Sequence, residues 1–171
     1  MDAISTNNNP NLFILHYGDD WTVRSLFLIP AFFFSGSAIQ KRNPLAPTAR
    51  RAGWVGCNIL LSEIADEGKI RVISEGVPES PQIVRNRFQS VRPLADIDVR
   101  TRGWTLDVLR MIRRLGQKRF SLQDVYTFEG DLSAIYPDNR NIRPKIRQQL
   151  QVLRDIGFIA FEGSGNYRVL R

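Results

Sequence analysis

The feature that most constrains the fold of this chain is the order of patterns in residues 103–171. Residues 105–115, 121–137 and 142–156 each show the marks of a helix: apolar side chains about three or four residues apart, a capping box with Asp at its fourth position, or a glycine just past the end. Residues 158–161 and 167–170 are short apolar segments joined by a glycine-rich turn and predict a hairpin. Three helices followed by a hairpin is the order of a winged helix.

The preceding residues show a different, strand-rich pattern. Residues 11–17 and 21–29 are apolar segments on either side of Gly-Asp-Asp and predict a hairpin, and residues 54–61 and 69–74 predict two further strands. The proline that opens residues 81–88 suits the first turn of a helix. Residues 89–102, with a proline and scattered charges, are expected to be a linker. The fold class predicted for the whole chain is therefore α+β.

The charge of the chain favours a polyanionic partner. The 171 residues include 24 Lys and Arg against 17 Asp and Glu, a net charge of +7. Residues 1–102 carry 12 basic and 10 acidic side chains, whereas residues 103–171 carry 12 basic and 7 acidic ones. The predicted winged helix therefore holds most of the excess, which favours double-stranded DNA as its partner.

The third predicted helix is the strongest candidate for contact with DNA. Its apolar face consists of Ile142, Ile146, Leu150, Leu153 and Ile156. The opposite face and the N-terminus carry Arg140, Asn141, Arg143, Lys145, Arg147, Gln148 and Gln151. Arg can pair with guanine, and Asn or Gln with adenine, in the major groove. The alternatives are a solvated helix face and a winged helix that binds protein.

The hairpin that follows this helix is the candidate wing. Ser164, Asn166 and Arg168 lie in or beside its turn and are expected to contact backbone phosphates. A plain two-stranded turn would account for the same residues.

Several other site classes are excluded or disfavoured by composition. Cys57 is the only cysteine and His16 the only histidine, so this chain by itself builds neither a zinc cluster nor a disulfide framework. We expect Cys57 to be a small core residue and His16 to be packed or at a sheet edge. No apolar run approaches the roughly 20 residues of a membrane span, and the first residues do not resemble a signal peptide. These observations predict a soluble cytoplasmic protein.

One short segment matches a catalytic motif in its residue types but not in its sequence context. Glu67-Gly68-Lys69 has the E-x-K spacing of PD-(D/E)xK nucleases, in which carboxylates hold Mg²⁺ that activates water. No Pro-Asp precedes it at a suitable distance, and it lies in a turn before a predicted strand. We interpret Glu67 and Lys69 as turn residues and assign no catalytic residue.

Long strings of the sequence resemble one family. NNPNLFILHY (8–17), PLAPTARRAGWVGCNI (44–59), RGWTLDVL (102–109) and KIRQQLQVLRDIGFIAFEGSGNYR (145–168) are similar, in this order, to DpnI-type or Dam-replacing methyl-directed restriction endonucleases. The resemblance implies a PD-(D/E)xK nuclease domain, here as a partial sheet over residues 1–100, followed by a winged-helix DNA-binding domain over residues 103–171. It also implies a type II restriction function directed at GATC sites that contain N6-methyladenine.

The resemblance implies a departure as well. In the family, the catalytic motif and a four-cysteine zinc cluster lie upstream of the segment that matches residues 8–17. The Mg²⁺ and zinc sites are therefore expected upstream of this chain, which would hold no cofactor itself, would be N-terminally truncated and would not cleave DNA. A sheet shortened in this way should expose edges and apolar surface. The alternatives are a complete or split endonuclease, with the catalytic half encoded upstream or on a separate catalytic chain, and a transcription regulator insensitive to methylation.

The resemblance also gives a role to the aromatic residue of the second string. In the family this tryptophan helps to sense methylated adenines, so Trp54 would contact the N6-methyl groups, and Arg50 and Arg51 would hold phosphates beside it. Without the resemblance, Trp54 would be interpreted as a loop residue that caps the core.

Overall fold

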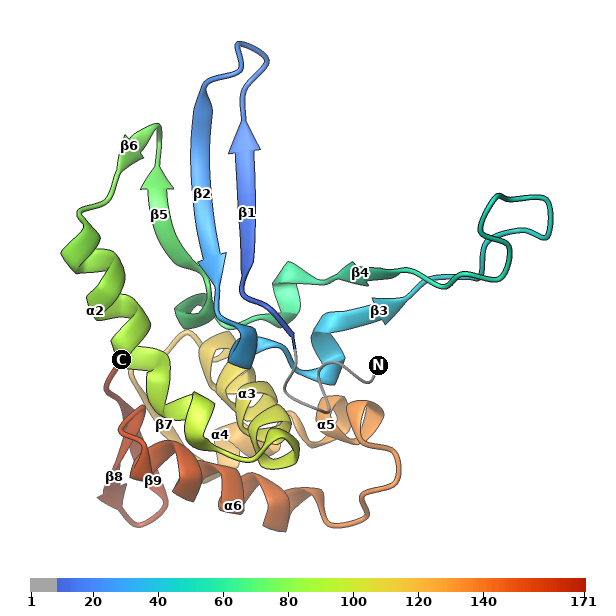
Figure 1. Ribbon diagram of the computed structural model, residues 1–171. Helices are drawn as coiled ribbons and strands as arrows, with labels where there is room; N and C mark the ends of the chain where they lie inside the picture. The colour runs from blue at the N-terminus through green and yellow to red at the C-terminus, as the bar shows by residue number, and fades with distance from the viewer. Residues whose placement is uncertain (1–8) are drawn as a thin grey trace.

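The N-terminal part of the chain forms a four-stranded sheet that lies above the helices in Figure 1. The computed structural model describes residues 9–171, so the first eight residues of the predicted 1–100 part lie outside the described residues. Four antiparallel strands form this sheet in the order β1-β2-β5-β6: β1 (Leu12–Tyr17), β2 (Val23–Ile29), β5 (Ile70–Ser74) and β6 (Val77–Pro78). The predicted hairpin over residues 11–29 is confirmed.

Strand β1 forms an open edge of this sheet. Phe13 and Leu15 are 61% and 52% exposed, and the edge strand also carries the exposed His16. Apolar side chains are thus exposed on this sheet, and of the two positions expected for His16, packed or at a sheet edge, the structure shows the edge. Helix α2 (Pro81–Val91) lies beside β5, and it begins where Ser80 Oγ accepts a hydrogen bond of 3.3 Å from the Ile83 amide.

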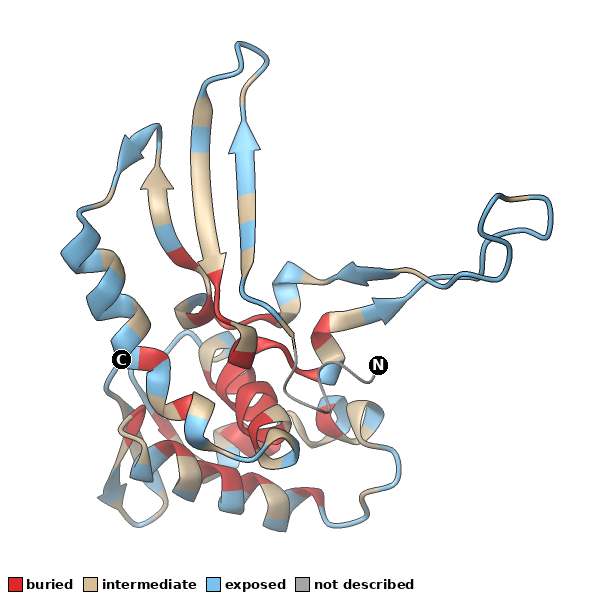
Figure 2. Ribbon diagram, in the orientation of Figure 1, coloured by how far each residue is buried: buried red, intermediate tan, exposed pale blue. Residues whose placement is uncertain are grey.

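A second, two-stranded sheet projects away from the body of the molecule (Figure 1). It pairs β3 (Ile39–Lys41) with β4 (Cys57–Ile59), and we call residues 39–59 the arm. Figure 2 shows that the arm is almost wholly exposed. The prediction that Cys57 is a core residue is therefore wrong, because this strand has no sheet face against the core. The predicted strand over residues 54–61 is correspondingly short.

Short 3-10 helices connect these strands to one another and to the rest of the chain. They are η1 (Ala31–Phe33), η2 (Gly36–Ala38), η3 (Leu61–Glu63), η4 (Asp66–Gly68) and η5 (Arg92–Asp96). Gly68 ends η4 directly against the ring of Phe33: a Cβ atom built on it would lie 2.3 Å from Phe33 Cδ1. A larger residue does not fit there without displacement of the ring.

The C-terminal unit is a winged helix, as the sequence pattern predicts. Its elements are α3 (Val99–Arg114), β7 (Arg119–Ser121), α4 (Leu122–Tyr126), α5 (Glu129–Ile135), α6 (Ile142–Asp155), β8 (Ile159–Gly163) and β9 (Asn166–Val169). The three strands form one sheet in the order β7-β9-β8. The predicted α+β class is confirmed.

Two local expectations are corrected, and one strand was not expected. Residues 89–102 are not a linker, since α2, η5 and the first turn of α3 occupy most of them, and Asp98 caps α3 by accepting from the amides of Arg100 and Thr101 at 3.0 and 3.3 Å. The single second helix is two helices, α4 and α5. Strand β7 has no counterpart in the sequence-based prediction.

The core of the winged helix is centred on α3. Figure 2 shows α3 buried along most of its length, with the inner side of α6 packed against it. The predicted apolar face of α6 is buried, except that Ile156 at its end is half-buried. Between the two helices, buried Thr105 Oγ1 donates a hydrogen bond of 2.7 Å to Gln149 Oε1. Across residues 9–171, no helix combines the length and apolarity that crossing a membrane requires.

Candidate nucleic-acid interface

The outer face of α6 presents polar and basic side chains in a fixed arrangement. Arg147 and Gln148 are exposed, and Arg147 Nη1 donates a hydrogen bond of 3.1 Å to the Tyr126 hydroxyl. The Arg143 guanidinium lies 5.0 Å from the centroid of the Tyr126 ring, and its Nε is 2.7 Å from Glu129 Oε2. Tyr126 of α4, itself nearly buried, therefore holds two arginines of α6 side by side.

The N-terminus of α6 carries further predicted contacts. Arg140 and Asn141 are exposed, and the Asn141 amide donates to Asn139 Oδ1 at 2.8 Å. Lys145 is half-buried instead, with its Nζ 2.9 Å from Gln148 Oε1. At the other end of the outer face, Gln151 is exposed. Six of the seven predicted residues are thus exposed on α6 or just before it, and Lys145 is the exception. Backbone amides at a helix start add hydrogen-bond donors for a phosphate.

The predicted wing is the turn between β8 and β9. Ser164 at its tip has a φ of 48°, and the neighbouring Asn166 is exposed. Arg168 on β9 forms an intramolecular hydrogen bond, with its Nε 2.8 Å from Glu162 Oε1. The hydrogen bond from Arg168 is the main cause that lowers the pKa of the Glu162 carboxyl below its usual range. The wing therefore presents one ionised carboxylate as well as its basic residues.

One basic residue of the wing is missed by the sequence-based prediction. Arg119 on β7 stands opposite Arg168 in the sheet register, and its Nε is 3.1 Å from Glu162 Oε2. Two arginines thus flank one glutamate. The signal in the sequence is weak, because buried Phe120 lies between exposed Arg119 and half-buried Ser121 in a strand of only three residues.

The three remaining predicted residues lie on the arm. Arg50, Arg51 and Trp54 are exposed, and the arm places them apart from α6 (Figure 1). The Trp54 ring lies against Gly56, where a Cβ atom would come within 3.0 Å of Trp54 Cζ3. With Trp54 53% exposed, the alternative that it caps the core is wrong. The arm presents an aromatic face and two guanidinium groups together to solvent.

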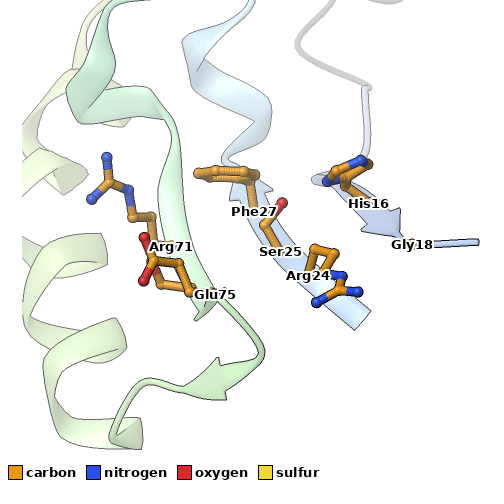
Figure 3. A pocket seen from close by; sticks show the side chains of 8 residues that line it. His16, Gly18, Arg24, Ser25, Phe27, Arg71 and Glu75 are labelled. Atoms are coloured by element: carbon orange, nitrogen blue, oxygen red, sulfur yellow. The ribbon is translucent and has the colours of Figure 1, made fainter. Parts of the chain in front are cut away.

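The first sheet carries an open hollow of about 690 Å³ (Figure 3). His16 from β1 and Ser25 from β2 face each other in the register, and Arg71 and Glu75 line its other side. Ser25 is a hydroxyl neighbour for His16 that the sequence alone does not indicate. Arg24 at the rim is paired with Asp20 at 3.1 Å. The charges around the hollow largely offset one another, which gives it no clear preference for an anion.

The E-x-K letters are turn residues, as interpreted from the sequence. Glu67 lies in η4 and forms an ion pair with Arg113 of α3, while Lys69 Nζ is 3.0 Å from Asp66 Oδ1. Within residues 9–171 the structure groups no three His, Cys, Asp or Glu side chains in a way that could hold a metal ion. No metal-dependent step is therefore assigned to Glu67 and Lys69.

Comparison with known families accounts for both halves of the chain. Residues 1–97 match the model of the Dam-replacing family, and residues 100–169 match the model of the Dam-replacing HTH (helix-turn-helix) domain. The second match covers the winged helix from α3 to β9, which carries the basic face of α6. Helix-turn-helix units bind DNA through such a helix. The chain therefore belongs to the DpnI-type Dam-replacing family and carries its DNA-binding domain.

Proposed function

We propose that this chain reads GATC sites whose adenines are N6-methylated, within a DpnI-type restriction system. The observation that carries the proposal is the pair of surfaces described above: the outer face of α6, where Tyr126 holds Arg143 and Arg147, and the arm, where Trp54 is exposed beside two arginines. Each surface is basic and polar, and each suits one part of a methylated duplex.

The two surfaces would take different roles. Arginine and glutamine side chains on α6 would pair with base edges in the major groove, and the wing would contact phosphates. Trp54 would cover the N6-methyl groups, because a methyl group loses contact with water when an aromatic face packs on it. Arg50 and Arg51 would neutralise phosphates beside it.

The proposed role is reading rather than cutting. Cleavage with Mg²⁺ requires carboxylates that converge on one ion, and Glu67 is instead engaged by Arg113. The absence of cleavage is tested by adding Mg²⁺ to the chain and labelled methylated GATC duplex: the chain alone should leave the duplex intact, and cut products would contradict the proposed role.

The direct test is fluorescence anisotropy of the purified 171-residue chain on labelled duplexes. Three duplexes of equal length are compared: methylated GATC, unmethylated GATC, and methylated adenine in a different sequence. EDTA prevents cleavage, and ionic strength is held at about 0.15 M because phosphate contacts alone give salt-dependent, non-specific binding. Preferential binding of the first duplex supports the proposal. Equal binding of all three would contradict it and would favour a methylation-insensitive winged-helix regulator.

A further inference from the structure

The segments that join the arm to the rest of the chain, η2 on one side and η3 on the other, both contact the same turn of α3. We call these two segments the roots of the arm. At the first root, Ser37 Oγ in η2 donates a hydrogen bond of 2.5 Å to Asp107 Oδ1, and Ser35 Oγ lies 3.4 Å from the same atom. At the second root, Glu63 in η3 forms an ion pair with Arg110. Asp107 and Arg110 are three residues apart on α3, with Arg110 Nη2 3.9 Å from Asp107 Oδ1. The arm is thus anchored to a helix of the winged-helix unit.

The same aspartate also connects to the N-terminal turn of α6. The Tyr136 hydroxyl donates a hydrogen bond of 2.6 Å to Asp107 Oδ2. The Tyr136 ring stacks on Trp104 with 3.6 Å between ring centroids and 13° between planes. Lys145 of α6 lies 5.8 Å from the centroid of Trp104. An unbroken series of contacts therefore runs from the roots of the arm to α6.

Burial makes these contacts difficult to break. Asp107 is 1% exposed and Arg110 is 8% exposed, so neither can replace a lost partner with bulk water. A buried carboxylate that loses a hydrogen-bond donor is left uncompensated in a medium of low dielectric constant. The network therefore favours one orientation of the arm over its alternatives.

We propose that this network, which we call the arm-root network (Ser35, Ser37, Glu63, Asp107, Arg110 and Tyr136), fixes the direction of the arm relative to α6. Asp107 and Arg110 are then positioning residues: they touch no DNA and set where Trp54 stands with respect to the outer face of α6. The part of the proposal that concerns DNA rests on the proposed function. The geometric part does not.

The geometric part is tested by measuring the distance between spin labels on the arm and on α6. Cys57 is the only cysteine, and both Cys57 and Ala52 are exposed, so a Cys57→Ser, Ala52→Cys, Asp155→Cys background carries one label at each end. We expect a narrow distance distribution in this background. Ser37→Ala and Glu63→Gln, made separately, should broaden it while thermal unfolding stays cooperative.

Two variants control this measurement. Ser37→Thr keeps the hydroxyl donor and should restore the narrow distribution. Gln40→Ala removes the 3.1 Å hydrogen bond from Asn58 Nδ2, which lies at the base of the arm but outside the arm-root network, and should leave the distribution narrow. A distribution that is broad already in the background, or that Ser37→Ala and Glu63→Gln leave narrow, overturns the proposal.

The part that concerns DNA is tested by a double-mutant cycle on the methylated GATC duplex. If the arm and α6 bind one duplex as a rigid pair, Ser37→Ala should weaken binding by about fivefold or more when the arm is intact. It should have little effect when Arg50→Ala and Arg51→Ala have already removed the charges of the arm. Equal weakening in both backgrounds would mean that Ser37 supports the fold alone and would overturn this part. If the unmodified chain does not bind the duplex, the proposed function fails, and the distance measurement decides the geometric part by itself.

Discussion

The hydroxyl of Tyr136 donates a hydrogen bond of 2.6 Å to the buried Asp107 Oδ2 and so joins the end of α5 to α3. Burial is the main cause that raises the pKa of Tyr136, so this group stays protonated and remains a donor. Tyr136→Phe removes one donor from a carboxylate that water cannot reach. We expect a loss of about 1–3 kcal/mol in the free energy of unfolding, measured by urea denaturation.

Tyr17→Phe is the matched control for Tyr136→Phe. Tyr17 is 49% exposed on β1, so removal of its hydroxyl should change stability by less than about 0.5 kcal/mol. Equal losses for the two variants would contradict the role assigned to the Asp107 hydrogen bond.

Asp107 itself predicts a dependence of stability on pH. Burial raises the pKa of its carboxyl above the usual value of 3.8, and this effect outweighs the hydrogen bonds from Ser37 and Tyr136 and the charge of Arg110. The folded state therefore binds this proton more tightly than the unfolded state does. The resulting stabilisation is complete below the unfolded pKa and is lost as the pH rises through the folded pKa.

The measurement compares the urea midpoints of the unmodified chain and Asp107→Asn from acidic to neutral pH. Asn does not titrate, so the stability of the unmodified chain relative to the variant should fall as the pH rises. A difference that stays constant or grows with pH would show that the pKa of Asp107 is not raised by folding.

The sequence predicts the winged helix well because its signals are local. The helix over residues 142–156, its glycine stop and the hairpin after it follow from periodicity and turn residues within short windows, and the exposed Arg147 and Gln148 follow from the same periodicity. Strand β7 escapes prediction because it has three residues and gains its definition from pairing with β9, far along the chain.

The arm and its anchoring could not be predicted in this way. The apolar run around Cys57 has the composition of a core strand, and no local pattern indicates that the strand would leave the body of the molecule. Ser37 and Asp107 are separated by 70 residues in the sequence, and neither belongs to a recognisable motif. Only the folded arrangement makes them partners, which is why sequence analysis gave Trp54 a role but no fixed position.

The arginines of α6 predict a specific loss of DNA binding. Arg147→Ala removes a guanidinium that Tyr126 holds on the outer face, and we expect a loss of about 1–3 kcal/mol in binding free energy on the methylated GATC duplex. Arg85→Ala is the control, because it removes the same charge from an exposed site on α2. Anisotropy titrations at fixed salt measure both. A similar loss for Arg85→Ala would indicate that net charge alone drives binding.

Trp54 predicts a change in selectivity without a change in stability. Because Trp54 is half-exposed on the arm and its ring lies against Gly56 of the same arm, Trp54→Ala should leave the melting temperature unchanged. The ratio of affinities for methylated and unmethylated GATC should fall towards 1. Trp21→Ala removes a tryptophan that is 79% exposed on the β1–β2 turn, and it should preserve the ratio. If Trp54→Ala keeps the full preference for methylated DNA, the methyl group is sensed elsewhere.

Among the glycines described, we expect Gly68 to show the largest loss of stability when a single methyl group is added. A Cβ atom on Gly68 would lie 2.3 Å from Phe33 Cδ1, and the Phe33 ring is 2% exposed, so it has no free space into which to move. Gly68→Ala should therefore lower the free energy of unfolding by about 1–3 kcal/mol through overpacking.

Gly130→Ala is the control and should have the opposite effect on stability, because Gly130 lies within α5 with nothing within 4 Å of its built Cβ atom. Alanine there should stabilise the chain by about 0.5–1 kcal/mol, since it restricts the unfolded backbone. Urea denaturation of the two variants side by side checks both signs, and a neutral Gly68→Ala would mean that η4 can separate from Phe33 at little cost.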